Sequence, residues 1–123
     1  MRQRKIPEDL DCGLTISMKV FGAKWKPCII DAIHKGFRRP SQMHRAITAA
    51  PPRVIDMQLR ELERFGIVRK NVFMEVPLRT EYYLTDTGRS LLPIIQTLNI
   101  WGLRNKDLVS SIDINGGVSA ATA

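Results

Sequence analysis

The sequence predicts a mainly α-helical fold with one small β-hairpin, and three observations support this fold class. Apolar residues recur at helical spacing in several segments between residues 14 and 104. The segment after Gly66 is instead rich in β-branched and aromatic residues, and a similar segment follows a short loop. At 123 residues, 44% of them hydrophobic, the chain can bury one modest core.

The charge balance narrows the class of partner. The 19 Lys and Arg residues outnumber the 12 Asp and Glu residues, which gives a net charge of +7. Such a charge favours nucleic acid or an acidic membrane surface. No segment approaches the ~18 consecutive apolar residues of a membrane span, and the first residues lack the apolar run of a secretory signal. We therefore predict a cytoplasmic protein with no membrane partner.

Three short helices are expected in the first part of the chain. Residues 14–21 have helical apolar spacing. Residues 25–36 follow, with Pro27 in the first turn, where a missing N–H costs nothing. Ser41 is a candidate N-cap for a third helix, residues 41–47.

Residues 51–69 are predicted to hold an amphipathic helix that ends at Gly66, a residue suited to the left-handed cap position. Two prolines suit its entrance. At about 100° per residue, three apolar side chains face the core and four other side chains line the opposite face. The core-facing residues are Ile55, Leu59 and Leu62, and the opposite face carries Arg53, Met57, Arg60 and Arg64.

A tight turn at residues 49–52 joins this helix to the preceding one, which is typical of a helix-turn-helix whose second helix reads DNA. Guanidinium groups on such a helix suit phosphates and guanine edges in a major groove. The alternative is an ordinary solvated helix face. We predict base contacts by Arg53, Asp56, Met57, Gln58 and Arg60, a phosphate contact by Arg64, and flanking contacts by Arg39 and Ser41.

Two extended segments, residues 68–73 and 81–84, predict a hairpin whose loop lies at residues 75–79. A hairpin directly after a recognition helix is a wing, so the predicted fold is a winged helix-turn-helix. We expect positive charge on the wing from Arg69, Lys70 and Arg79. An arginine at a wing tip can enter the minor groove, and the alternative for Arg79 is a solvent-exposed loop residue.

A long helix is predicted from its N-cap, Thr85 or Asp86, to about Arg104. Its apolar surface is wider than one buried face requires. We expect a second copy to cover it together with the first helix, so that the N- and C-terminal helices are dimerisation helices; the alternative is a helix that crosses a monomer core. The candidate dimer contacts are Leu14, Met18, Leu91, Ile94, Ile95, Leu98 and Trp101.

The predicted domain layout has three parts. Residues 1–11 form a flexible basic arm, and residues 12–109 form the winged helix-turn-helix domain with its dimerisation helices. Residues 110–123 are small and weakly apolar, and we predict a disordered tail to which no role is assigned.

Several ordered motifs resemble a known family. They are GAKW at residues 22–25, LRELERFGIVRK at residues 59–70, VPLRTEYYLTDTG at residues 76–88, and the closing Trp101-Gly102. Through them, residues 12–102 resemble the HxlR-type family of bacterial winged-helix transcription regulators, relatives of the MarR-like dimers. The resemblance implies a homodimer that places two recognition helices in successive major grooves of double-stranded DNA, at a pseudo-palindromic operator, with the wings beside them.

The chain departs from the family pattern at three positions. Pro51 stands where the family often has a serine cap, Pro40 where it usually has phenylalanine, and Leu78 where the wing has a second proline. None of these departures removes a cation from the groove-facing side, so DNA binding is still expected. They do affect base preference, because that depends on the register of the helix.

The resemblance also concerns Cys12, which occupies the place of a cysteine that senses oxidants or electrophiles in some relatives. A helix N-terminus lowers the pKa of a thiol, whereas the nearby Asp9 and Asp11 disfavour the thiolate. Cys12 is therefore a candidate redox thiol, and the alternative is an inert, partly buried cysteine. Cys28 lies among isoleucines and is predicted to be a small core residue.

No catalytic or metal-binding pattern is found. The two cysteines and two histidines are not spaced as a zinc site, and no glycine-rich loop has the context of a phosphate cradle. We predict no enzyme activity and no cofactor. Three function classes stay open: a homodimeric sequence-specific transcription regulator, a regulator that responds to an oxidant or small molecule, and a basic module that docks an acidic protein without binding DNA.

Overall fold

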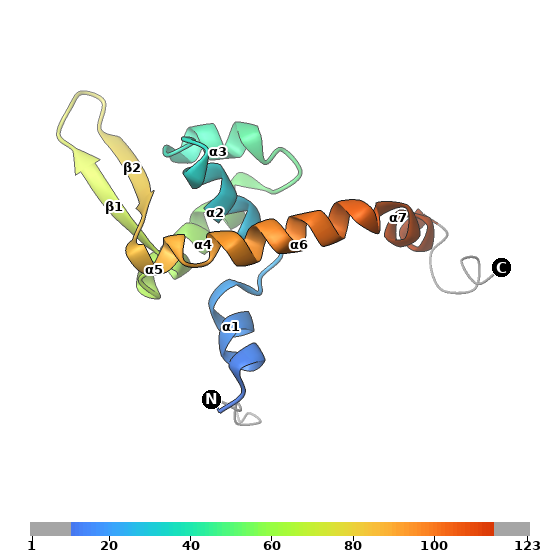
Figure 1. Ribbon diagram of the computed structural model, residues 1–123. Coiled ribbons are helices and arrows are strands. Elements are labelled where there is room, and N and C mark those ends of the chain that lie inside the picture. The colour runs from blue at the N-terminus through green and yellow to red at the C-terminus, as the bar shows by residue number, and fades with distance from the viewer. Residues whose placement is uncertain (1–10, 115–123) are drawn as a thin grey trace, which may run out of the picture. The chain divides into compact units, whose positions relative to one another are not determined.

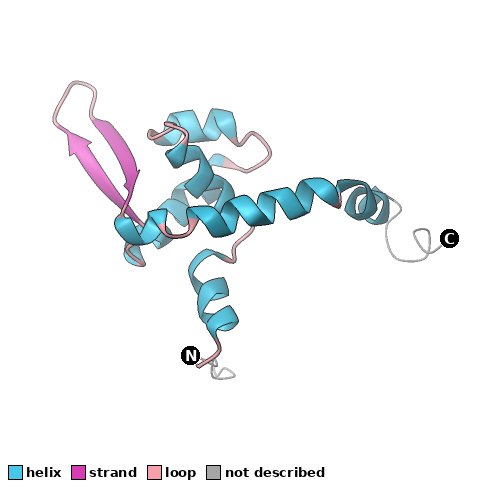
Figure 2. Cartoon of the chain, in the orientation of Figure 1, coloured by secondary structure: helices cyan, strands magenta, loops and turns pink. Residues whose placement is uncertain are grey.

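The computed structural model describes residues 11–114, and this part of the chain is mainly helical with one two-stranded antiparallel sheet (Figure 1). The fold class predicted from the sequence is confirmed (Figure 2). The described residues divide into two compact units, residues 11–90 and residues 91–114. The predicted domain of residues 12–109 spans parts of both units.

The first unit contains four helices, then the hairpin, then a short helix. The elements lie within a few residues of the predicted segments. Their bounds are α1 (Gly13–Phe21), α2 (Lys26–His34), α3 (Pro40–Ala46), α4 (Pro52–Arg64), β1 (Val68–Phe73), β2 (Arg79–Leu84) and α5 (Asp86–Arg89).

The start of α3 differs from the prediction. Its N-cap is Arg39, not Ser41, because Pro40 occupies the first helical turn, where its fixed φ suits the helix. The Gln42 side chain accepts hydrogen bonds from the backbone N–H groups of Arg38 and Arg39, each at 3.0 Å. This closure of the helix entrance fixes the connector between α2 and α3.

Two glycines end helices in the left-handed conformation. Gly66 has φ +75°, and its N–H donates to the carbonyl of Glu63 while the next N–H, of Ile67, donates to Leu62. This pattern is a Schellman motif, which satisfies the last carbonyls of a helix, and it confirms the predicted end of α4. Gly36, with φ +102°, ends α2 in the same way.

The core of the first unit lies where α2, α3, α4 and the hairpin pack against one another. The core-facing residues predicted for α4 are all buried. Burial of these apolar side chains stabilises each element by roughly 1.5–3 kcal/mol per residue before entropy is counted. The most completely buried side chains are Ile29, Ile30, Ile33, Met43, Ile55, Leu59, Leu62 and Val68.

The long helix predicted from Thr85 to Arg104 is interrupted. The Thr85 hydroxyl accepts from the Gly88 N–H at 3.0 Å and so caps only the short α5. Helix α6 (Leu92–Arg104) begins separately, with Pro93 in its first turn. A proline in a helix interior lacks one hydrogen bond and clashes with the preceding turn, so a continuous helix is not formed there.

The second unit contains α6 and a further helix, α7 (Lys106–Ile114). The predicted disordered tail therefore begins inside a helix, and that prediction is wrong for residues 110–114. Apolar residues Leu108 and Ile112 have the i, i+4 spacing of a helix face. The rest of that tail, residues 115–123, and nearly all of the predicted arm lie outside the described residues. No helix between residues 11 and 114 combines the length and apolar character that a membrane span requires.

Candidate nucleic-acid interface

The outer face of α4 carries three unpaired cations. Arg53, Arg60 and Arg64 are exposed, as is Met57 between them. Among residues 11–114, none of these guanidinium groups forms an ion pair, and the charge of Arg64 makes only a minor contribution to the lowered pKa of Glu61. The opposite face of α4 is anchored in the core, which holds this stripe in a fixed orientation. Such a surface can contact phosphates and base edges.

Gln58 does not belong to this face. It lies about 140° around the helix from Arg53 at ~100° per residue, and it is only 6% exposed. Its Oε1 atom is buried without a hydrogen-bond partner among the described residues. The predicted base contact of Gln58 conflicts with this burial. Gln58 was predicted to contact bases because it is polar and lies on α4, whereas its angular position places it nearer the core.

Asp56 is held by the protein itself. Its Oδ1 atom lies 2.8 Å from Nε2 of His44, which joins α3 to α4. The aspartate side chain is 43% exposed, so it still reaches the surface beside the outer face of α4. The contact orients α3 relative to α4.

The two faces of the hairpin differ in what they present. Side chains of directly paired residues lie on the same face of a sheet. Lys70 pairs with the buried Tyr82, so it lies on the face that packs toward α4. Arg69 pairs with Tyr83, and Arg79 with Phe73, so both arginines lie on the other, outer face. Of the three predicted wing cations, only Lys70 is on the α4 side.

Arg79 is not a free cation at the wing tip. It lies in β2, and its guanidinium donates to Glu75 at 2.7 Å and to Glu81 at 2.6 Å. The same group lies 3.9 Å from the centre of the Phe73 ring. The hydrogen bond from Arg79 lowers the pKa of Glu75. The predicted minor-groove contact would require these pairs to break. The alternative, a solvent-exposed loop residue, also disagrees with the position of Arg79 in β2.

The same network lowers the pKa of Glu81, first through the hydrogen bond from the Tyr83 hydroxyl and then through that from Arg79. Arg39 adds a weaker ion pair, with its Nε atom 3.7 Å from Glu81. The outer face of the hairpin is thus tied to the start of α3 by charge.

A groove of about 430 Å³ lies between the start of α3 and the hairpin loop. It brings together the two predicted flanking residues, Arg39 and Ser41, with residues 75–80 of the hairpin. The loop itself presents exposed apolar side chains, Met74, Val76 and Leu78, where a cation was expected.

The two cysteines have different surroundings. Cys12 is the N-cap residue of α1, and hydrogen bonds from the side chain and backbone of Thr15 lower the pKa of its thiol. Cys28 is exposed, so its predicted place in the core is wrong. Partial desolvation of the Cys28 thiol, with a smaller effect of Asp31, raises its pKa. Of the two, Cys12 has the surroundings of a reactive thiol.

Most candidate dimer contacts are exposed apolar side chains. Trp101, for example, is 61% exposed on α6. Leu91 is half-buried, and Ile95 is buried, which conflicts with its predicted contact to a second copy. The exposed members are Leu14, Met18, Ile94, Leu98 and Trp101. Among residues 11–114, no cluster of histidine, cysteine, aspartate and glutamate could hold a metal ion.

Comparison with known proteins adds independent observations. The family model described as HxlR-like helix-turn-helix matches residues 20–110. The chain is 36% identical over 110 residues to the uncharacterized HTH-type transcriptional regulator YybR of Bacillus subtilis (strain 168), and the match covers 89% of this chain and 88% of the relative.

Solved structures agree with this match. The redox regulator HypR in its oxidized form gives a TM-score of 0.72 at 36% identity, with 76% of this chain and 97% of that chain covered. The reduced form of HypR gives a TM-score of 0.74 at 35% identity, and the match covers 81% of this chain and 99% of that chain. Diamide-treated YodB from B. subtilis gives a TM-score of 0.63 at 26% identity, and the match covers 78% of this chain and 96% of that chain.

Proposed function

The chain belongs to the HxlR-like helix-turn-helix family of transcriptional regulators, and from this premise we propose that it binds operator DNA as a homodimer through α4. One observation carries the proposal. Arg53, Arg60 and Arg64 form an unpaired cationic stripe on a helix whose other face is fixed in the core. This stripe has the length and charge to follow a major groove.

The residues divide into two roles in this proposal. Arg53, Met57 and Arg60 meet base edges: an arginine can bind guanine through two hydrogen bonds, and an apolar side chain can contact a thymine methyl group. Arg64 and Lys70, with Arg39 and Ser41 at the start of α3, meet backbone phosphates, which give affinity without sequence preference. Asp56 limits which bases fit beside Arg53 and Arg60.

The homodimer is supported by the exposed apolar residues of α1 and of α6, because contiguous exposed apolar surface marks interaction sites. A twofold dimer would present two α4 helices to half-sites about one helical turn, ~34 Å, apart. A pseudo-palindromic operator follows from that symmetry.

Selection of bound duplexes from a random pool, followed by titration at several salt concentrations, tests this function. Arg60→Gln should relax the preference at one base position of each half-site. Lys70→Gln should weaken all sequences alike and reduce the salt slope by roughly 0.9 for each phosphate that the variant no longer binds. Equal losses on every sequence for both variants would contradict the assignment. No duplex binding at physiological salt would favour a basic module that docks an acidic protein.

A second candidate function is regulation by oxidants through Cys12. It is supported by the lowered pKa of its thiol and by the similarity of the chain to HypR, a redox regulator, and to YodB, which was solved after diamide treatment. The Cys12 thiolate attacks one oxygen of hydrogen peroxide. A sulfur–oxygen bond forms, the oxygen–oxygen bond breaks, and hydroxide leaves, which gives a sulfenic acid at the start of α1.

Hydrogen peroxide titrated against the protein–operator complex tests this second function. The wild type and Cys28→Ser should lose operator affinity together, whereas Cys12→Ser should keep it. The Cys28 variant is the matched control, because it removes the thiol whose pKa is raised. An identical response of Cys12→Ser and the wild type would rule the thiol out as the sensor.

A further inference from the structure

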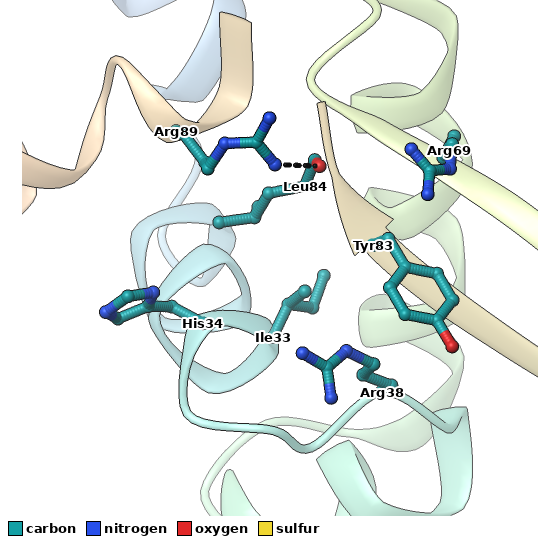
Figure 3. Close-up of a pocket in the computed structure, with 7 residues that line it drawn as sticks. All are labelled: Ile33, His34, Arg38, Arg69, Tyr83, Leu84 and Arg89. Carbon is teal, nitrogen blue, oxygen red and sulfur yellow. Dashed lines mark hydrogen bonds between the residues drawn. The ribbon is translucent and has the colours of Figure 1, made fainter. Parts of the chain in front are cut away.

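A small pocket lies on the outer face of the hairpin, away from α4. Its volume is about 150 Å³, and it is lined by residues of α2, the connector before α3, both strands and α5. Figure 3 shows the guanidinium groups of Arg38, Arg69 and Arg89 on three sides of it, with the His34 imidazole on another. The lining residues include no carboxylate.

Two of these guanidinium groups are held by one aromatic ring. The Cζ atom of Arg38 lies 5.0 Å from the centre of the Tyr83 ring, and that of Arg69 lies 5.4 Å from it. Cation–π contact orients a guanidinium without using its N–H donors. Neither arginine has a carboxylate partner among residues 11–114, and Nε of Arg38 is buried without any hydrogen-bond partner.

The charges around the pocket leave it cationic. Arg89 donates to the Leu84 carbonyl at 3.0 Å and pairs with Asp86, so its charge is largely balanced. Glu81 is the other nearby acid, and it receives the Tyr83 hydroxyl at 2.5 Å and Arg79. The charges of Arg38 and Arg69 are therefore without a counter-ion in this part of the molecule.

We propose that this pocket binds a phosphate-sized oxyanion between Arg38 and Arg69. Sites for drug-sized ligands are about 300–1,000 Å³, so a pocket of 150 Å³ suits a small ion better than an organic effector. The planar donor fork of arginine matches the oxygens of phosphate, and both Arg38 and Arg69 line the pocket. The phosphate comes either from solution or from the DNA backbone.

The pocket joins elements that the proposed DNA contacts depend on. Arg69 belongs to β1, next to Lys70, and Arg38 immediately precedes Arg39. The Arg38 carbonyl also accepts the Tyr82 N–H at 2.8 Å, so the connector already runs beside β2. An anion bridging the two side chains fixes the hairpin against this connector.

Inorganic phosphate titrated into the full-length ¹⁵N-labelled protein at constant ionic strength tests the site without DNA, so this arm is independent of the proposed function. The Nε–H signals of Arg38 and Arg69 should shift to saturation. Arg38→Gln and Arg69→Gln should each bind at least tenfold more weakly. Arg104→Gln, which removes one exposed arginine from α6, is the charge-matched control and should bind as the wild type does.

The DNA arm identifies the source of the phosphate. If a backbone phosphate fills the pocket, Arg69→Gln should reduce the salt slope of duplex binding by about 0.9 more than Arg104→Gln does. If only free phosphate fills it, the two slopes should agree while phosphate binding still depends on Arg38 and Arg69.

The proposal is overturned if all variants bind phosphate equally well. It is also overturned if the phosphate titration does not saturate and Arg69→Gln and Arg104→Gln have the same salt slope of duplex binding. Because Arg69 is exposed on a strand, Arg69→Gln keeps the test valid even if Arg38→Gln fails to fold. Circular dichroism of each variant establishes that it is folded.

Discussion

His44 and Asp56 connect the two helices of the helix-turn-helix, with Nε2 of His44 2.8 Å from Oδ1 of Asp56. The pair spans α3 and α4, whose relative orientation decides where the outer face of α4 points. The sequence predicted a base contact for Asp56 and no role for its helix-connecting contact. The contact shows that Asp56 also has a structural role.

We expect Asp56→Ala to lower the free energy of unfolding by about 0.5–1 kcal/mol, the usual range for a partly exposed, solvent-screened pair. Urea unfolding at pH 7 measures this change. Asp31→Ala is the control, because it removes an exposed pair with Lys35 within one helix and should change stability less. Equal losses for both variants would mean that the α3–α4 contact contributes no more to stability than an exposed ion pair within one helix.

The buried Lys26 and its partner Glu61 predict a pH dependence of stability. Nζ of Lys26 lies 2.8 Å from Glu61, and this hydrogen bond lowers the pKa of Glu61 from 4.5. The folded-state pKa lies below the unfolded one. The contribution is therefore complete above pH ~4.5 and is lost as the pH falls through the lower, folded-state value.

Glu61→Gln should therefore unfold about 1–3 kcal/mol more easily at pH 7, because it leaves Lys26 buried without a counter-charge. Urea unfolding from pH 7 down to pH 3 should show the difference from the wild type shrinking as Glu61 becomes protonated. A difference that stays constant over this range would contradict the linkage.

Gln58→Leu should raise the free energy of unfolding by up to about 1 kcal/mol, since it replaces a buried, unpaired amide with an apolar side chain. It should leave the base preference unchanged, because Gln58 faces the interior. Met57→Ala, one residue earlier on the exposed face, should alter that preference instead. Selected-duplex profiles of both variants distinguish the two positions, and a changed profile for Gln58→Leu would restore its predicted DNA contact.

Arg79→Gln should loosen the hairpin more than it weakens DNA binding. Arg79 holds Glu75 and Glu81 and covers Phe73 on the face away from α4. Amide hydrogen exchange at residues 74–80 should accelerate severalfold, while the salt slope of duplex binding should fall less than in Lys70→Gln. If Arg79→Gln reduces the salt slope by about 0.9, the value for one phosphate contact, the arginine must leave its carboxylates to bind DNA.

Trp101→Lys should shift the protein from dimer to monomer, because it puts a charge in the exposed apolar surface of α6. Sedimentation equilibrium measures the shift, and operator affinity should fall with it. Gln96→Lys adds the same charge at an exposed polar position of α6 and is the matched control. A Trp101→Lys dimer as stable as the control would exclude this surface as the interface.

Local patterns predicted much of the fold. The end of α4 followed from Gly66, since few other residues adopt a positive φ without strain. The core-facing side of α4 followed from the spacing of its apolar residues, and β1 from its residue types. The break before α6 was missed, although Pro93 was visible, because a continuous apolar pattern outweighed a single residue.

The candidate site was less predictable. Polarity alone could not separate Gln58, which is buried, from Met57, which is exposed. Nor could it show that Arg79 is neutralised by Glu75 and Glu81, because strand register decides which side chains share a face. The sequence predicted no role for Arg38. The proposed role in anion binding depends on the connector lying beside β2, where the Tyr82 N–H donates to the Arg38 carbonyl.

By itself, the sequence determined the approximate position of most helices and of the hairpin in residues 13–84, which side of α4 is anchored and which family the chain resembles, because periodicity, glycine positions and ordered motifs are local properties. Tertiary structure decided which cations are available: among the described residues it left Arg53, Arg60 and Arg64 without ion pairs and paired Arg79 with two carboxylates. The physical reason is that a charge is available to a ligand only when no neighbour neutralises it, and neighbours are set by how separate elements pack.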